Sequence, residues 1–127
     1  MTNTQWGQIT HFRASEFDSP DEKGSGGNMD YEFVRKLDTL RELCGFSFVI
    51  HSGYRSPGHN AELPDAVPDS AHTQGLAADI GTPTSGMRFA LVRHALASGF
   101  RRVGIGKTFV HLDMDETKPQ DVVWLYS

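Results

Sequence analysis

The chain has 127 residues, a formal net charge of −4 and a hydrophobic content of 38%, which fits one compact domain that buries a core without disulfides or a structural metal. No apolar run approaches the ~20 residues that a membrane span requires, so we expect no membrane span. The acidic balance, without clusters of Lys or Arg, argues against nucleic acid as a partner.

The first 30 residues predict an arm and a loop. The start, MTNTQWGQITHF, has neither the basic region nor the apolar region of a secretory signal, so we expect cytoplasmic synthesis. Residues 18–28 combine Pro, Gly, Ser and charge without periodicity. They indicate a surface loop inside a single domain that spans residues 1–127.

The next segments predict a helix, a strand and an irregular excursion. Apolar residues recur at close to helical spacing at Tyr31, Val34, Leu37, Leu40 and Leu43. Gly45 then stands where a helix would end. The aromatic and β-branched run at 46–50 predicts a buried strand. Residues 57–70 contain three prolines and predict an irregular excursion.

A second amphipathic helix is expected over residues 85–98, closed by Gly99. Its predicted inner face consists of Met87, Ala90, Leu91, Ala95 and Leu96. Three short strands are predicted after it, at 101–106, 108–114 and 121–126. This order of elements predicts an α+β fold with two main helices and a small, mostly antiparallel sheet.

Strand alternation in the segment TFVHLDM, residues 108–114, places Phe109, His111 and Asp113 on one face. His111 and Asp113 are therefore expected to point the same way. The preceding glycines, Gly104 and Gly106, are interpreted as a tight strand connection, because the longer pattern of a dinucleotide site is absent.

A metal site is suggested by the run SAHTQGLAAD at residues 70–79. His72 and Asp79 converge if the chain between them turns tightly and then enters a strand, and His111 offers a third donor. Two imidazoles and one carboxylate suit zinc and leave a fourth position open, as in catalytic sites. By composition alone, an ordinary core or surface residue is the favoured interpretation of each histidine, and the spacing by itself does not overturn it.

Four ordered segments resemble a known family. SAHTQGLAAD is similar to the Ser-x-His-x-x-Gly-x-Ala-x-Asp motif of the zinc D-Ala-D-Ala carboxypeptidases and related phage endolysin peptidases. Residues 51–57, with Asn60, are similar to the family's Ser-Gly-Tyr-Arg-Ser segment, FVHLD to its closing strand, and HFRASEF at 11–17 to the N-terminal box of one branch. The resemblance covers residues 11–115 and implies a Hedgehog/D-Ala-D-Ala-peptidase-like fold.

The resemblance also implies roles for individual residues. It implies that zinc is bound by His72, Asp79 and His111. Arg55 would bind the substrate carboxylate or the oxyanion, although a salt bridge that fixes the loop is the alternative. Ser70 would either orient substrate or fix the turn before His72. Gly75 would allow a backbone geometry that a Cβ obstructs.

The sequence departs from the family pattern at Thr108. Many relatives have an acidic general base three positions before the last zinc ligand, and a threonine cannot take that role. Asp113 is the nearest replacement and would accept the proton of the attacking water. It could instead orient a ligand histidine, or be a plain surface carboxylate. Asp115 is a weaker candidate for the base.

The function that the resemblance implies is zinc-dependent hydrolysis of an amide bond in the peptide stem of bacterial peptidoglycan. Carboxypeptidase action at D-Ala-D-Ala and endopeptidase action of the L-Ala-D-Glu type both remain open. We expect a monomer that reaches the cell wall as an endolysin released by a holin-type route, or as part of a virion. The alternative is a catalytically silent zinc-binding or structural module, such as a phage tail component, which Thr108 favours.

Overall fold

A computed structural model describes residues 1–64 and 66–127. The α-helices of this part are α1 (Asn3–Trp6), α2 (Tyr31–Cys44), α3 (Pro57–Glu62) and α4 (Ser85–Ala97). Short 3₁₀ helices are η1 (Ala14–Phe17), η2 (Ser25–Asn28) and η3 (Ala71–Gln74). The strands are β1 (Ile50–Ser52), β2 (Ala77–Gly81), β3 (Arg102–Ile105), β4 (Phe109–Asp113) and β5 (Val122–Leu125).

One five-stranded sheet has the strand order β1-β2-β4-β3-β5. The predicted α+β class is confirmed, but the sheet is mixed, because β3 and β5 pair in parallel while β1–β2, β2–β4 and β3–β4 are antiparallel. β5 follows β4 in the chain, runs opposite to it and takes the outer edge beyond β3. Since β3 also runs opposite to β4, β3 and β5 share a direction.

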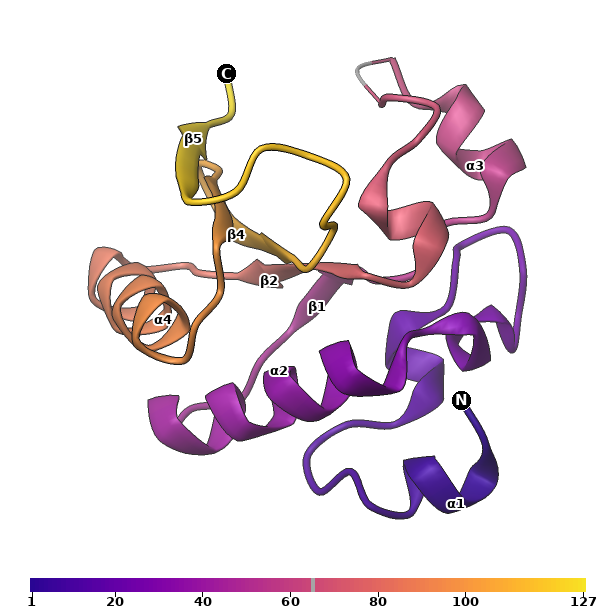
Figure 1. The fold of residues 1–127 in the computed structure, drawn as a ribbon, viewed down its shortest axis with the longest axis horizontal. Coiled ribbons are helices and arrows are strands. Elements are labelled where there is room, and N and C mark those ends of the chain that lie inside the picture. The colour runs from indigo at the N-terminus through magenta and orange to yellow at the C-terminus, as the bar shows by residue number, and fades with distance from the viewer. Residues whose placement is uncertain (65) are drawn as a thin grey trace.

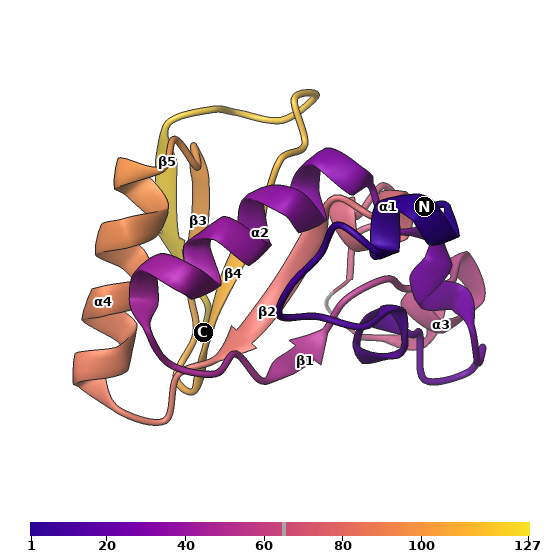
Figure 2. The ribbon, with the colours of Figure 1, turned by 90° about the horizontal axis from the view of Figure 1, so that it is seen from below.

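Helices α2 and α4 lie side by side against one face of the sheet (Figures 1 and 2). Alternate residues of the strands pack there with residues of both helices in one core. Its fully buried members include Val34, Leu37, Leu40, Leu91, Val103, Val110 and Leu112. The opposite face of β4 is therefore left for the polar residues of the candidate site.

The two main helices begin and end at residues that the backbone chemistry favours. In α2, the Asp30 side chain accepts a hydrogen bond from the Phe33 amide, and Gly45 ends the helix with a φ of 74°. The predicted end of α2 is confirmed. α4 ends at Ala97, and Leu96 is 49% exposed rather than part of the inner face. Leu96 lies outside the narrow stripe of α4 that meets the sheet.

The predicted strand at 46–50 is wrong in its position, since β1 spans Ile50–Ser52. Phe48 is nevertheless buried, because its ring packs against Phe46 at 5.6 Å and against Phe12 at 6.2 Å between centroids. The aromatic pattern thus reports burial rather than strand pairing. Within the predicted excursion at 57–70, the structure forms α3, whose first turn is capped by Ser56.

The N-terminal box holds the chain that leads to Arg55. Phe17 is fully buried, and its carbonyl accepts a hydrogen bond from the Tyr54 amide at 2.8 Å. A Cβ on Gly53 would approach the Phe17 Cα to 2.7 Å. This close contact explains why a glycine precedes Tyr54. No helix within residues 1–64 and 66–127 has the length and apolar character needed to cross a membrane.

Candidate metal centre and its cleft

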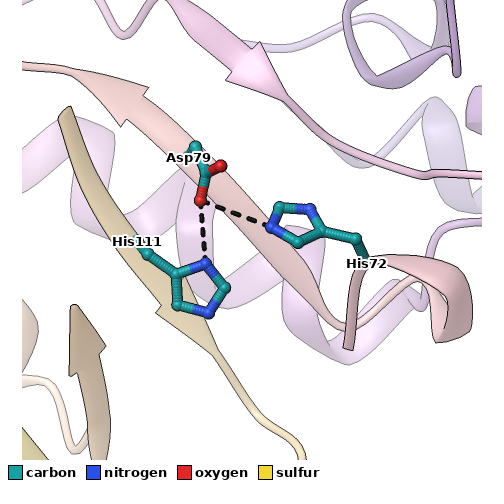
Figure 3. Close-up of side chains that lie close together, drawn as sticks. All are labelled: His72, Asp79 and His111. Carbon is teal, nitrogen blue, oxygen red and sulfur yellow. Dashed lines mark hydrogen bonds and ion pairs between the residues drawn. The ribbon is translucent and has the colours of Figure 1, made fainter. Parts of the chain in front are cut away.

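Asp79 and His111 meet because β2 and β4 pair in register. Asp79 lies directly opposite His111 in the antiparallel ladder, so both side chains project from the same face. The Asp79 Oδ1 and His111 Nδ1 atoms are 2.8 Å apart (Figure 3). The strand predicted to follow the turn after His72 and to carry Asp79 is β2.

His72 reaches this pair from η3, immediately before β2. Ser70 caps η3, since its Oγ accepts a hydrogen bond from the His72 amide. Gly75 ends η3 with a φ of 71°, and a Cβ there would lie 2.9 Å from the Met29 Cα, which confirms the expected need for glycine. The turn brings His72 Nε2 to 3.3 Å from Asp79 Oδ1.

The second nitrogen of each imidazole has a buried acceptor. His72 Nδ1 lies 2.8 Å from the Gly53 carbonyl, and His111 Nε2 lies 2.7 Å from Asp113 Oδ2. When both nitrogens donate to these acceptors, the lone pairs of His72 Nε2 and His111 Nδ1 converge on Asp79. These three ligand atoms lie within 4.8 Å of one another and could hold a metal ion between them. The donor set therefore fits zinc.

Protonation of the metal-free site follows the same contacts. Burial lowers the pKa of His72. Burial acts in the same direction on His111, but hydrogen bonds to Asp113 and Asp79 outweigh it and raise the pKa of His111. Burial disfavours the Asp79 carboxylate, yet the hydrogen bond from His111 holds its pKa well below the usual range. Without metal, these contacts therefore favour protonation of His111 over protonation of His72.

Asp113 lies on the far side of His111 from Asp79. It is 2% exposed, and its Oδ1 accepts hydrogen bonds from Arg102 Nε at 2.7 Å and from the Asp115 amide at 3.1 Å. Both oxygens are therefore engaged, one by His111 and one by these donors. The predicted shared face of His111 and Asp113 is confirmed, whereas the role of Asp113 as general base stays a prediction.

Asp115 is bound into the loop between β4 and β5. This buried carboxylate accepts hydrogen bonds from the Thr117 amide and hydroxyl, and from Lys118 Nζ at 2.6 Å. Thr108 immediately precedes β4, and its carbonyl accepts a hydrogen bond from the Thr82 amide. Neither residue offers a free carboxylate to the metal centre.

Arg55 borders the metal centre from the loop between β1 and α3. Its backbone amide donates to the His72 carbonyl, and its Nη2 lies 3.8 Å from Asp79 Oδ2. Nε donates to Ser52 Oγ and Nη1 to Asn60 Oδ1, both at 3.3 Å. These contacts hold the guanidinium beside Asp79 with N–H groups left to donate. Burial lowers the pKa of Arg55 without neutralising it.

A cleft of about 540 Å³ opens above the metal centre, with Arg55 and Ser70 in its lining. The lining includes four apolar residues that follow α3 and three aromatic residues of the sheet region: Leu63, Pro64, Ala66 and Val67, and Phe109, Trp124 and Tyr126. Burial raises the pKa of Tyr126 to about 12, so its hydroxyl keeps a proton to donate. Sequence reasoning missed Arg102, Trp124 and Tyr126, although alternation along 121–126 would have placed the two aromatic residues on one face.

The comparisons agree with this geometry. A family model described as Peptidase M15 matches residues 10–113. The chain belongs to the peptidase M15 family. M15 peptidases are zinc-dependent, so membership supports a metallopeptidase with a metal at the His-Asp-His cluster. The M15 match ends at the last residue of β4 and leaves β5 outside. Among curated proteins, none matches the chain.

Proposed function

We propose that this M15 peptidase uses zinc to hydrolyse an amide bond in the peptide stem of bacterial peptidoglycan. The observation that carries the proposal is the convergence of His72 Nε2, Asp79 Oδ1 and His111 Nδ1 at the floor of an open cleft. Zinc, when bound, supplies a Lewis acid that polarises the scissile carbonyl and lowers the pKa of water.

Arg55 is proposed to bind an anionic oxygen of the substrate. Its guanidinium is held by Ser52 and Asn60 next to the metal ligand Asp79, and it lines the cleft. A planar, permanently charged group in this position suits either a terminal carboxylate or the oxygen that gains charge in the transition state. Ser70 borders the same cleft and is proposed to fix the turn before His72 and to face the substrate with its remaining hydrogen-bonding capacity.

Asp113 is proposed to act on His111 rather than on water. Its hydrogen bond to His111 Nε2 selects the tautomer whose Nδ1 faces Asp79, and Arg102 holds the carboxylate in place. This is the second of the three roles considered from sequence. The first, a general base, would require Asp113 to give up one of these contacts during each turnover.

The catalytically silent zinc-binding module remains the second candidate function. It is favoured by Thr108 at the position of the usual acidic base and by the full hydrogen bonding of Asp113. Such a protein would bind zinc and stem peptide without cutting the peptide. The module and the enzyme therefore differ in a single observable, which is product formation.

The proposal is tested by digesting purified peptidoglycan with zinc-loaded protein and analysing the products by mass spectrometry. Loss of a terminal D-Ala would indicate a carboxypeptidase, and a split within the stem an endopeptidase. The His111→Ala variant should release neither product, whereas His94→Ala, on helix α4, should match the wild type. No product from the zinc-loaded wild type between pH 5 and 9 would refute the proposal and favour the silent module.

A further inference from the structure

The two glycines Gly104 and Gly106 do more than connect strands. Gly104 lies beside His111 on one side and beside Trp124 on the other in the register of the sheet. A Cβ on Gly104 would approach Tyr126 Cε2 to 2.6 Å and Trp124 Cε2 to 2.8 Å. A Cβ on Gly106 would overlap the Phe109 ring, with Cδ1 and Cζ at 2.5 Å and Cε1 closer still. The absence of a side chain at both glycines therefore leaves room for the aromatic rings of Trp124, Tyr126 and Phe109.

Trp124, on β5, and Tyr126, just after it, differ in their exposure to solvent. The Trp124 ring packs between the Arg102 guanidinium, at 4.8 Å from the ring centroid, and the His111 ring, at 5.4 Å. The Tyr126 ring packs against Phe109 at 5.1 Å and against His111 at 6.1 Å, yet Tyr126 is 42% exposed. Trp124 is thus partly covered by its neighbours, while Tyr126 presents more free surface to the cleft.

We propose that Tyr126 is a substrate-contacting, specificity-determining residue of this peptidase. Its ring packs against the stem peptide beside the metal centre, and its hydroxyl donates a hydrogen bond to a peptide oxygen. An aromatic ring with a polar end suits a peptide, which combines apolar side chains with backbone carbonyls. The same cleft is also lined by the apolar residues Leu63, Pro64 and Val67, which add further apolar surface for a peptide. The inference rests on the proposed function and concerns a segment outside the M15 match.

The test compares three variants of the full chain in the zinc-loaded state with a synthetic stem pentapeptide. Tyr126→Ala should lower kcat/KM at least about tenfold, mainly through KM, because it removes ring and hydroxyl. Tyr126→Phe should lose about 2- to 10-fold, which corresponds to one hydrogen bond. Leu125→Ala is the matched control, since Leu125 is adjacent on β5, points to the opposite face and is 81% exposed. It should stay within about twofold of the wild type.

Zinc affinity separates a substrate contact from support of His111. It should be unchanged in Tyr126→Ala. Weaker zinc binding with a normal KM would overturn the inference, as would a Tyr126→Ala variant as active as Leu125→Ala. In either case the wild type still cuts the peptide, so the proposed function stands. A wild type that neither binds nor cuts the pentapeptide would refute the proposed function and this inference together.

Discussion

Replacing Asp113 by Asn distinguishes the two roles of this carboxylate. The amide side chain would keep the size of the original but carry one oxygen and one NH₂ group. Its single, uncharged oxygen could still accept a hydrogen bond from Arg102 Nε or from His111 Nε2. It could not replace both of the charged oxygens that now accept from these two donors. The substitution therefore removes the negative charge that fixes the His111 tautomer and faces Arg102.

The loss of stability expected for Asp113→Asn follows from the burial of the ion pair between Asp113 and Arg102. Arg102 would keep the Pro119 carbonyl and the Trp124 ring but lose its buried counter-ion. We expect the free energy of unfolding to fall by about 3 kcal/mol, the lower end of the usual range for losing one partner of a buried ion pair. The lower end applies because Asn retains one acceptor. Loss of the group that orients a ligand histidine weakens metal binding by roughly 10–100-fold.

Asp121→Asn is the matched control, because Asp121 also pairs with an arginine. Arg101 donates two hydrogen bonds to Asp121, but this ion pair is exposed to solvent. We expect no measurable change in its unfolding free energy or zinc affinity. The assays are denaturant unfolding, zinc titration against a competing chelator, and peptide turnover at saturating zinc. Normal zinc affinity with turnover reduced roughly 10²-fold or more would refute the positioning role and support Asp113 as the general base.

Three further outcomes are expected. Arg55→Lys should reduce activity substantially at unchanged zinc content, since it keeps the charge but loses the planar fork; unchanged kinetics would exclude a substrate contact. Because the pKa of His111 is raised, zinc should displace about one proton at pH 6, so zinc affinity should fall as the pH falls; calorimetry in buffers of different ionisation enthalpy measures the proton release. Removal of zinc by a chelator should leave the circular dichroism of a folded protein, because the core is complete without metal, and a random-coil spectrum would contradict this.

Much of the site could be predicted because its residues lie on regular elements or in a compact motif. The period of two in β4 placed His111 and Asp113 together, and the motif around Gly75 indicated a turn that joins His72 to Asp79. Helix α2 was predictable because its apolar spacing and its terminal glycine agree.

The remaining features depend on contacts that a sequence does not encode locally. Which nitrogen of His111 faces Asp79 depends on Asp113, whose own position depends on Arg102. The aromatic residues Trp124 and Tyr126 line the cleft because β5 pairs with β3 at the edge of the sheet. That pairing is set by tertiary packing rather than by the pattern of residues 121–126. The misplaced strand at 46–50 has the same origin, since ring packing satisfied those residues.

The central claim is that one zinc ion is bound through His72 Nε2, Asp79 and His111 Nδ1. X-ray diffraction from crystals of the zinc-loaded protein, recorded on both sides of the zinc absorption edge, tests it directly. We expect one strong anomalous peak bounded by these three side chains, with His111 Nε2 still bonded to Asp113. A peak elsewhere, or a zinc ion bound through His111 Nε2 with Asp113 as a ligand, would contradict the account.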